Sequence, residues 1–235
     1  MKLSKDCYKC LQRLVYQAAG LATNDKRTRE KAVEQGLKVL RDNYSYDEVS
    51  IVVATKIHDV IKEVTGNSDP YRILKDKEMV IARELYSEVG YKYGDGFKDL
   101  VRLAVLGNAL DFFRPFDAIK QDMRREVNFV IDDTEYFKEK LQDARTVLYL
   151  ADNAGEVFFD LPLVKWMKQF ASVTYVVKAA PVQNDITLDD IKNAGLEAEI
   201  QNIMTTDAII NISIINDGND FSMIICNSSI VKIRI

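Results

Sequence analysis

Polar side chains suited to phosphate chemistry follow two apolar segments in the second half of the chain. Asp152 and Asn153 come directly after one segment, Lys178 directly after the next, and Asn184 and Asp185 a few residues later. Carboxylate and carboxamide oxygens are hard ligands of the kind that Mg²⁺ and Mn²⁺ prefer. A hard cation can neutralise charge on a phosphate during its transfer, and a lysine can hold a phosphate oxygen. These residue types indicate a metal and phosphate site.

A second interpretation of the same residues is purely structural. Asp and Asn are common helix N-caps, so Asp152 and Asn153 are also what would begin an ordinary helix after a strand. The sequence contains neither the dinucleotide-binding pattern GxGxxG around Gly155 nor the P-loop pattern GxxxxGK[ST], which argues against a nucleotide site. Polar residues at the ends of two strands, not one, weaken the cap interpretation, and the residue pattern alone leaves both interpretations open.

The elements that must position these residues are two strands and a helix. Residues 146–152 (TVLYLAD), an apolar run that ends in a polar residue, and residues 173–177 (VTYVV) are typical of parallel strands buried on both faces. Residues 155–170 are long enough for the crossover helix between them, with Pro162 either kinking that helix or marking its first turn. Since ligands of open parallel sheets bind beyond the carboxyl ends of the strands, the polar residues should face one crevice. The fold class expected is α/β, with a Rossmann-like α/β/α parallel sheet.

The first part of the chain has a different pattern. Apolar residues recur there at spacings of three and four among charged residues, which predicts helices up to about residue 142, one of them closed by Gly66. We therefore expect a helical cap region over residues 1–143 and an α/β metal and phosphate domain over residues 144–235.

The end of the chain is harder to interpret. Thr187-x-x-Asp190 is a capping-box signature that should open a short helix, and a third strand is expected near residues 197–200. Residues 208–235 then form an atypical tail with 10 isoleucines in 28 residues, accompanied by Asn and Ser, which could form hairpins around Asp217-Gly218.

Composition and charge exclude several classes of protein. The 235 residues are 47% apolar, carry a formal net charge of -4 and contain no apolar stretch long enough to span a bilayer. We expect a cytosolic protein without a nucleic-acid or membrane partner, and any anionic substrate must be held by a local site. The three cysteines cannot form the disulfide framework of a secreted protein. Cys7 and Cys10 fit a helical packing stripe better than half a zinc site.

Two segments of the chain resemble the signature blocks of the damage-control phosphatases. These are ADNAGEVFFD at residues 151–160 and VVKAAPVQNDIT at residues 176–187. CYKC, GNSDPY and LGNALDF, at residues 7–10, 66–71 and 106–112, are similar to the short archaeal and bacterial branch of that family. The resemblance covers roughly residues 1–206.

The resemblance implies a fold, a cofactor and a substrate class. It implies a helical region packed on the sheet and hydrolysis of phosphomonoesters of sugars or damaged metabolites, with a divalent metal ion (Mn, Ni, Co or Mg). Asp185, Asp152 and Asn153 match its metal positions, and either Asp152 or water would attack phosphorus. The positions that it implies for substrate binding are Glu156, Lys178, Asn184, Asn108 and Asp111, although the residue pattern alone makes Asn108 and Asp111 a helix stop and cap.

The tail departs from the family pattern. The resemblance implies a motif similar to KGxGNxE near the C-terminus, with a lysine that binds phosphate, and residues 208–235 contain no such motif. Two hypotheses follow. The chain is either a metal-dependent phosphatase, favoured by the intact Asp152, Asn153 and Asp185, or a catalytically inactive relative that binds metal or sugar phosphate.

Overall fold

The computed structural model describes residues 2–108, 110, 116–125, 127–206 and 222–226 of the chain. Its internal contacts divide the chain into two compact units, which are described separately here. The helical unit comprises Met1–Leu74 and Pro181–Asn184, and the sheet unit comprises Lys75–Ala180 and Asp185–Ile235. None of the described helices is both long and apolar enough to cross a membrane.

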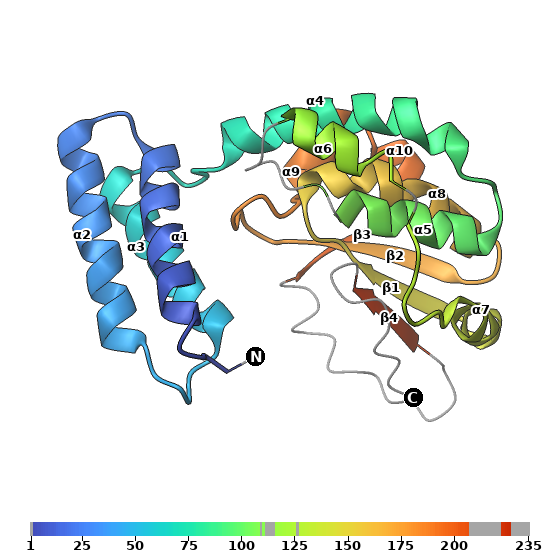
Figure 1. Ribbon diagram of the computed structural model, residues 1–235, viewed down its shortest axis with the longest axis horizontal. Coiled ribbons are helices and arrows are strands. Elements are labelled where there is room, and N and C mark those ends of the chain that lie inside the picture. The colour runs from blue at the N-terminus through green and yellow to red at the C-terminus, as the bar shows by residue number, and fades with distance from the viewer. Residues whose placement is uncertain (1, 109, 111–115, 126, 207–221, 227–235) are drawn as a thin grey trace. The chain divides into compact units, whose positions relative to one another are not determined.

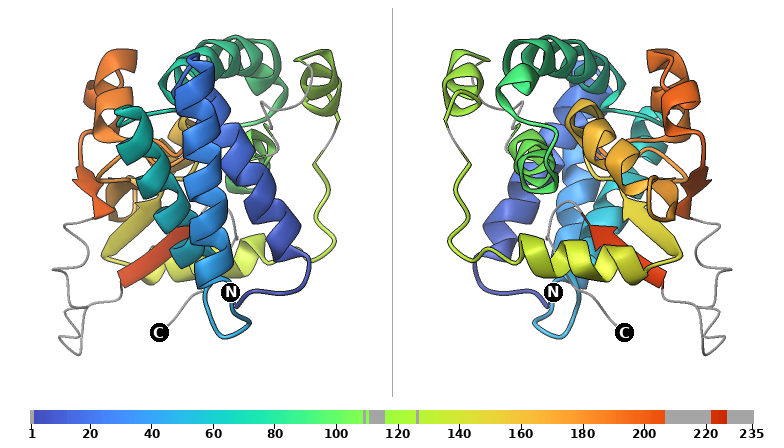
Figure 2. Two further views of the ribbon diagram at one scale, coloured as in Figure 1. Left: turned by 90° about the vertical axis from the view of Figure 1, so that its left-hand side faces the viewer. Right: turned by 90° about the vertical axis from the view of Figure 1, so that its right-hand side faces the viewer.

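Three helices pack side by side in the helical unit, as Figures 1 and 2 show: α1 (Cys7–Ala22), α2 (Lys26–Asn43) and α3 (Ser50–Thr65). Each buries an apolar stripe in a shared core that includes Val15, Leu40 and Ile57. A Cβ atom at Gly36 would lie 2.8 Å from Cγ1 of Val15, so glycine at this position permits the close approach of α1 and α2.

Local signals in the sequence fix the ends of these helices. The Asp25 carboxylate caps α2 by accepting a hydrogen bond from the Thr28 N–H (2.8 Å), and Gly66 ends α3 with a φ of 67°. The predicted stop at Gly66 is therefore confirmed. The packing stripe predicted for the two N-terminal cysteines is wrong for Cys10, which is exposed, whereas Cys7 is half-buried.

The sheet unit alternates helices and strands after an all-helical start. Its long helices carry apolar residues on the faces that meet the sheet core, and its strands are short. In chain order the elements are α4 (Arg72–Val89), η1 (Gly90–Lys92), α5 (Phe97–Asn108), α6 (Phe116–Asp122), α7 (Thr134–Asp143), β1 (Thr146–Leu150), η2 (Ala154–Glu156), α8 (Val157–Met167), β2 (Ser172–Val177), α9 (Leu188–Ala194), α10 (Glu197–Ile200), β3 (Ile203–Thr205) and β4 (Ser222–Cys226).

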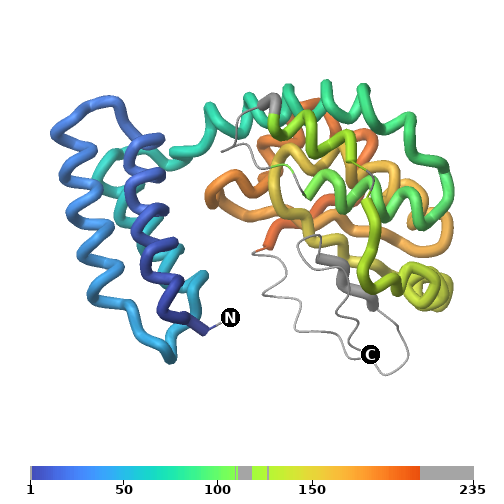
Figure 3. The backbone as a smooth tube through the Cα atoms, in the orientation of Figure 1, coloured from blue at the N-terminus to red at the C-terminus, as the bar shows by residue number. Residues whose placement is uncertain are grey.

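The strands form one parallel sheet in the order β3-β2-β1-β4. This is the order of the first four strands of the Rossmann arrangement, so the predicted α/β class and its parallel sheet are confirmed. In Figure 1, α5 and α8 lie on one face of the sheet, and the two helices contact each other. The crossover from β1 to β2 through α8 can be followed in Figure 3.

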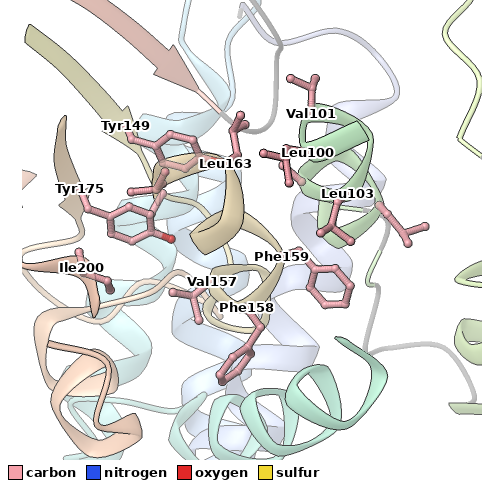
Figure 4. Packing of buried hydrophobic residues seen from close by; sticks show 14 of the residues in the cluster. Leu100, Val101, Leu103, Tyr149, Val157, Phe158, Phe159, Leu163, Tyr175 and Ile200 are labelled. Carbon is pink, nitrogen blue, oxygen red and sulfur yellow. The ribbon is translucent and has the colours of Figure 1, made fainter. Parts of the chain in front are cut away.

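The core of the sheet unit lies between the strands and these helices. Figure 4 shows Tyr149 and Tyr175 of the strands, Val157 and Phe159 of α8, and Leu100 of α5 within it. The side chains that alternate with Tyr149 on β1, at residues 148 and 150, are only half-buried. The described part of the chain thus buries one face of β1 fully and the other partly, where the sequence predicted full burial of both.

Three predictions need correction. Residues 197–200 form helix α10, and the third strand is β3, at residues 203–205. Helix α8 begins at Val157, so Pro162 lies inside it and not in its first turn. The tail supplies β4, which pairs in parallel with β1, and the hairpin predicted at residues 217–218 lies outside the described residues.

The domain boundary expected at residues 143 and 144 remains a prediction. Contacts place α5, α6 and α7 in the same compact unit as the sheet, and the division in the helical half falls at Leu74, within the first turn of α4.

Candidate functional site

The backbone brings the two predicted acidic positions to one edge of the sheet. After β2, a loop leaves the sheet and returns to α9, visible in orange in Figure 3. On its return, the Ile186 N–H donates to the Asp152 carbonyl oxygen (2.8 Å), and the Lys178 N–H donates to the Ile186 carbonyl oxygen (2.9 Å). Asn153 and Asp185 form an antiparallel β-bridge. The residues that follow β1 are therefore held beside Asp185 by main-chain hydrogen bonds.

Charges at this edge interact strongly. The Lys178 Nζ lies 3.3 Å from Asp185 Oδ2, with the Asp185 side chain 15% exposed. Burial raises the pKa of Asp185 to about 6, opposed by Lys178 and reinforced by the nearby Asp152. Burial also raises the pKa of Asp152, with Lys178 opposing the rise. Two half-buried carboxylates thus share one lysine, an arrangement that a further positive charge would stabilise.

A second cluster adjoins the first at the start of α8. The fully buried Glu156 carboxylate accepts hydrogen bonds from Asn153 Nδ2 at Oε1 and from Asn108 Nδ2 at Oε2 (3.5 Å). Burial raises the pKa of Glu156 to about 8, and the charge of Asp160 adds to the rise more than the amide of Asn153 reduces it. Because the Asn153 amide nitrogen is engaged, its carbonyl oxygen remains as the atom for a further ligand.

The helix-cap interpretation does not describe Asn153. It stands at the N-cap of η2, but its side chain makes no cap hydrogen bond and turns to Glu156 instead. The structure therefore uses this carboxamide to build a polar cluster and not to begin a helix.

The donor set fits a hard divalent cation. Asp152 and Asp185 offer carboxylate oxygens, Asn153 offers a carboxamide oxygen, and none of them is a soft ligand. Within the described ranges, no group of three or more His, Cys, Asp or Glu side chains is placed to bind a metal ion. A site here would therefore depend on the asparagine as its third protein ligand.

The other predicted substrate residues have separate outcomes. Asn108 reaches Glu156 from the end of α5, although Asn and Asp at that point also suited a helix stop. Asn184 is half-buried and belongs to the helical unit, so its role in substrate binding stays a prediction. Asp111 lies outside the described residues.

Two buried features near the site were not predicted from the sequence, an ion pair between Lys75 and Asp190 and the carboxylate of Asp160. The Lys75 Nζ of α4 lies 3.0 Å from Asp190 Oδ2, and both side chains are almost fully buried. Asp190 also completes the predicted capping box with Thr187. Asp160, one helical turn after Glu156, is fully buried. Its spacing of four from Glu156 was a readable signal, but Lys75 sits in an ordinary charged helical pattern that offers none.

A cavity of about 400 Å³ lies elsewhere in the sheet unit. Residues of α4, α8 and α9 line it, including Arg83 over the Phe158 ring at 5.0 Å, and the lining includes none of the predicted metal ligands. The position of the carboxylates, and not this cavity, identifies the candidate site.

The fold and the edge cluster define a parallel α/β protein with acidic and amide side chains gathered beyond the carboxyl ends of its strands. The chain belongs to the family of the damage-control phosphatase ARMT1-like domain, whose model matches residues 3–225.

Individual relatives agree with this assignment. A damage-control phosphatase of Archaeoglobus fulgidus is 33% identical over 216 residues, which cover 87% of this chain and 74% of the relative. Damage-control phosphatase PH1575 of Pyrococcus horikoshii is 28% identical over 220 residues, covering 90% and 76% of the two chains. The crystal structure of the DUF89 family protein PH1575 aligns with a TM-score of 0.77 over 88% of this chain and 74% of that one, at 27% identity. The resemblance suggested by the sequence is thus confirmed, and it supports a phosphatase role in broad terms.

Proposed function

We propose that the chain is a metal-dependent phosphatase that hydrolyses phosphomonoesters of sugars or damaged metabolites. The observation that carries the proposal is the return of Asp185 to the end of β1, where it meets Asn153 with Lys178 beside it. The names of the relatives support the phosphatase class.

Each residue at the edge has a role in this proposal. Asp152, Asn153 and Asp185 would hold a divalent ion, which supplies positive charge to a phosphate oxygen when bound. Glu156 accepts a hydrogen bond from the Asn153 amide nitrogen, which would leave the carboxamide oxygen available to hold the ion. Asn108 holds the other oxygen of Glu156.

Lys178 links metal binding to substrate binding. The Lys178 side chain is 36% exposed, and its ammonium group pairs with the Asp185 carboxylate. The ammonium group becomes available to a phosphate only if another cation binds this carboxylate. An ion at the edge would compensate the charge of Asp185 and leave the lysine ammonium to hold the phosphate. We therefore propose that Lys178 clamps substrate only in the metal-loaded protein.

Phosphate release tests the proposal. Metal-stripped protein is mixed with p-nitrophenyl phosphate and a panel of sugar phosphates, with Mg²⁺, Mn²⁺, Co²⁺ or Ni²⁺ added back separately. We expect release with at least one metal and none without, and a loss of about 100-fold or more in Asp185→Asn. Asp189→Asn is the matched control, because Asp189 is exposed and lies four residues away in α9.

The alternative is a relative that binds metal or sugar phosphate without hydrolysing it. Silence across the panel in correctly folded protein that still binds metal would favour this alternative. Full activity in Asp185→Asn would refute the proposed site.

A further inference from the structure

A buried carboxylate joins the two strands that carry the candidate site. Asp160 of α8 is fully buried and accepts hydrogen bonds from the hydroxyl groups of Tyr149 (2.7 Å) and Tyr175 (3.1 Å). The tyrosine rings stack with their centroids 5.4 Å apart and their planes 9° from parallel. They are direct neighbours in the register of β1 and β2, and Figure 4 shows them side by side.

Packing alone does not account for this arrangement. Removing a carboxylate from water has a large cost, and an aliphatic side chain of similar volume could fill the same space without it. Phenylalanine could likewise stack in place of each tyrosine. The three polar groups are therefore expected to define a geometry that apolar residues would leave less specific, because their hydrogen bonds are directional.

The positions of the three residues in the chain connect them to the site. Tyr149 lies three residues before Asp152, and Tyr175 lies three residues before Lys178. Asp160 lies one helical turn after Glu156, which holds the Asn153 amide. The hydrogen bonds of one carboxylate thus tie the ends of both strands to the beginning of the crossover helix.

We propose that Asp160 is a positioning residue that acts through Tyr149 and Tyr175. It holds the first turn of α8 against the ends of β1 and β2, so that Glu156 keeps the Asn153 carboxamide turned for metal binding. The inference deepens the proposed function and rests on it for its catalytic consequence. Asp160 contacts neither metal nor substrate in this role.

Three variants test the role. Asp160→Asn keeps the shape and removes the carboxylate, Tyr175→Phe removes one hydrogen-bond donor, and Leu163→Ala removes core volume on the same helix while keeping all three polar groups of the network. We expect Mn²⁺ affinity and kcat to fall about 10- to 100-fold in Asp160→Asn, with a smaller fall in Tyr175→Phe. Leu163→Ala should lower the melting temperature. It should change Mn²⁺ affinity by no more than about twofold, because lost core packing alone should not alter the site.

A readout independent of activity separates this inference from the proposed function. The signal of the Asn153 side-chain amide in a ¹⁵N spectrum can be identified by its loss in Asn153→Asp. The protons of this amide should exchange with water at least about tenfold faster in Asp160→Asn than in wild type. A wild-type protein without metal binding or turnover would remove the proposed function, while this exchange rate would still decide the positioning role. Unchanged exchange and Mn²⁺ affinity in both network variants, or equal losses in Leu163→Ala, would overturn it. If Asp160→Asn does not fold, Tyr175→Phe alone decides.

Discussion

Gly107 is the position where one added methyl group should test the packing behind the site. It lies in the last turn of α5, against α8. A Cβ atom there would lie 2.6 Å from Cβ and 3.0 Å from Cγ of Phe159. Nonbonded carbons pack at about 3.5 to 4.0 Å, so the methyl group is about 1 Å too close. Because the nearest atom of Phe159 is joined directly to the backbone, a side-chain rotation cannot relieve the clash, and α5 must move.

The expected cost follows from two opposing effects. Overpacking of a core costs about 1 to 3 kcal/mol, and replacing glycine by alanine inside a helix returns about 0.5 to 1 kcal/mol. A contact of 2.6 Å with Phe159 places the overpacking cost near the upper end of its range, so Gly107→Ala should lower the free energy of unfolding by about 2 kcal/mol. Urea unfolding followed by the fluorescence of Trp166 measures this, since Trp166 is the only tryptophan and lies in α8.

A matched glycine supplies the control. Gly20 is also helical, in α1, but a Cβ atom there would meet nothing within 4 Å. Gly20→Ala should raise the stability of the helical unit by about 0.5 to 1 kcal/mol, measured by circular dichroism. If Gly107→Ala is as stable as wild type, the close packing of α5 on α8 is refuted.

Two further changes address buried titratable groups. Burial lowers the pKa of His58 to about 4, so the free energy of unfolding should fall as pH drops from about 6.5 to 4. His58→Phe should remove up to about 3 kcal/mol of that fall, measured by urea unfolding at each pH. An identical pH dependence in both proteins would contradict this prediction. Lys75→Met should lower the free energy of unfolding by about 3 to 5 kcal/mol, because it leaves the Asp190 carboxylate buried without its cation. Lys120→Met, at the solvent-exposed pair with Glu88, should lower it far less. Equal losses of stability in thermal unfolding would argue against a buried pair.

The features that sequence predicted well are those with local causes. The stop at Gly66 requires a left-handed conformation, and the Thr187–Asp190 box satisfies its own backbone groups, so neither depends on distant residues. The first two strands and their crossover could be predicted because their apolar runs are long and uninterrupted.

The features that were missed depend on distant partners. Residues 203–205 become a strand only through pairing with β2, and three residues are too few for a sequence pattern to predict this. Residues 197–200 are likewise too few for periodicity to distinguish a helix from a strand. Lys75 can be buried because its ammonium group donates a hydrogen bond to the carboxylate of Asp190, which is 115 residues away in the sequence. At the site, the metal ligands remain a prediction from residue types, whereas the hydrogen bonds of Glu156 with two asparagines could be seen only in the assembled elements.

The most direct test of the account is Mn²⁺ binding followed by electron paramagnetic resonance on metal-stripped wild type, Asp185→Asn and Asp189→Asn. We expect wild type and Asp189→Asn to bind one Mn²⁺ with similar affinity, and Asp185→Asn to bind about 100-fold more weakly or not at all. Undiminished binding of Mn²⁺ by Asp185→Asn would show that the ion, if the protein uses one, is held elsewhere, and would contradict the metal site at the edge of the sheet.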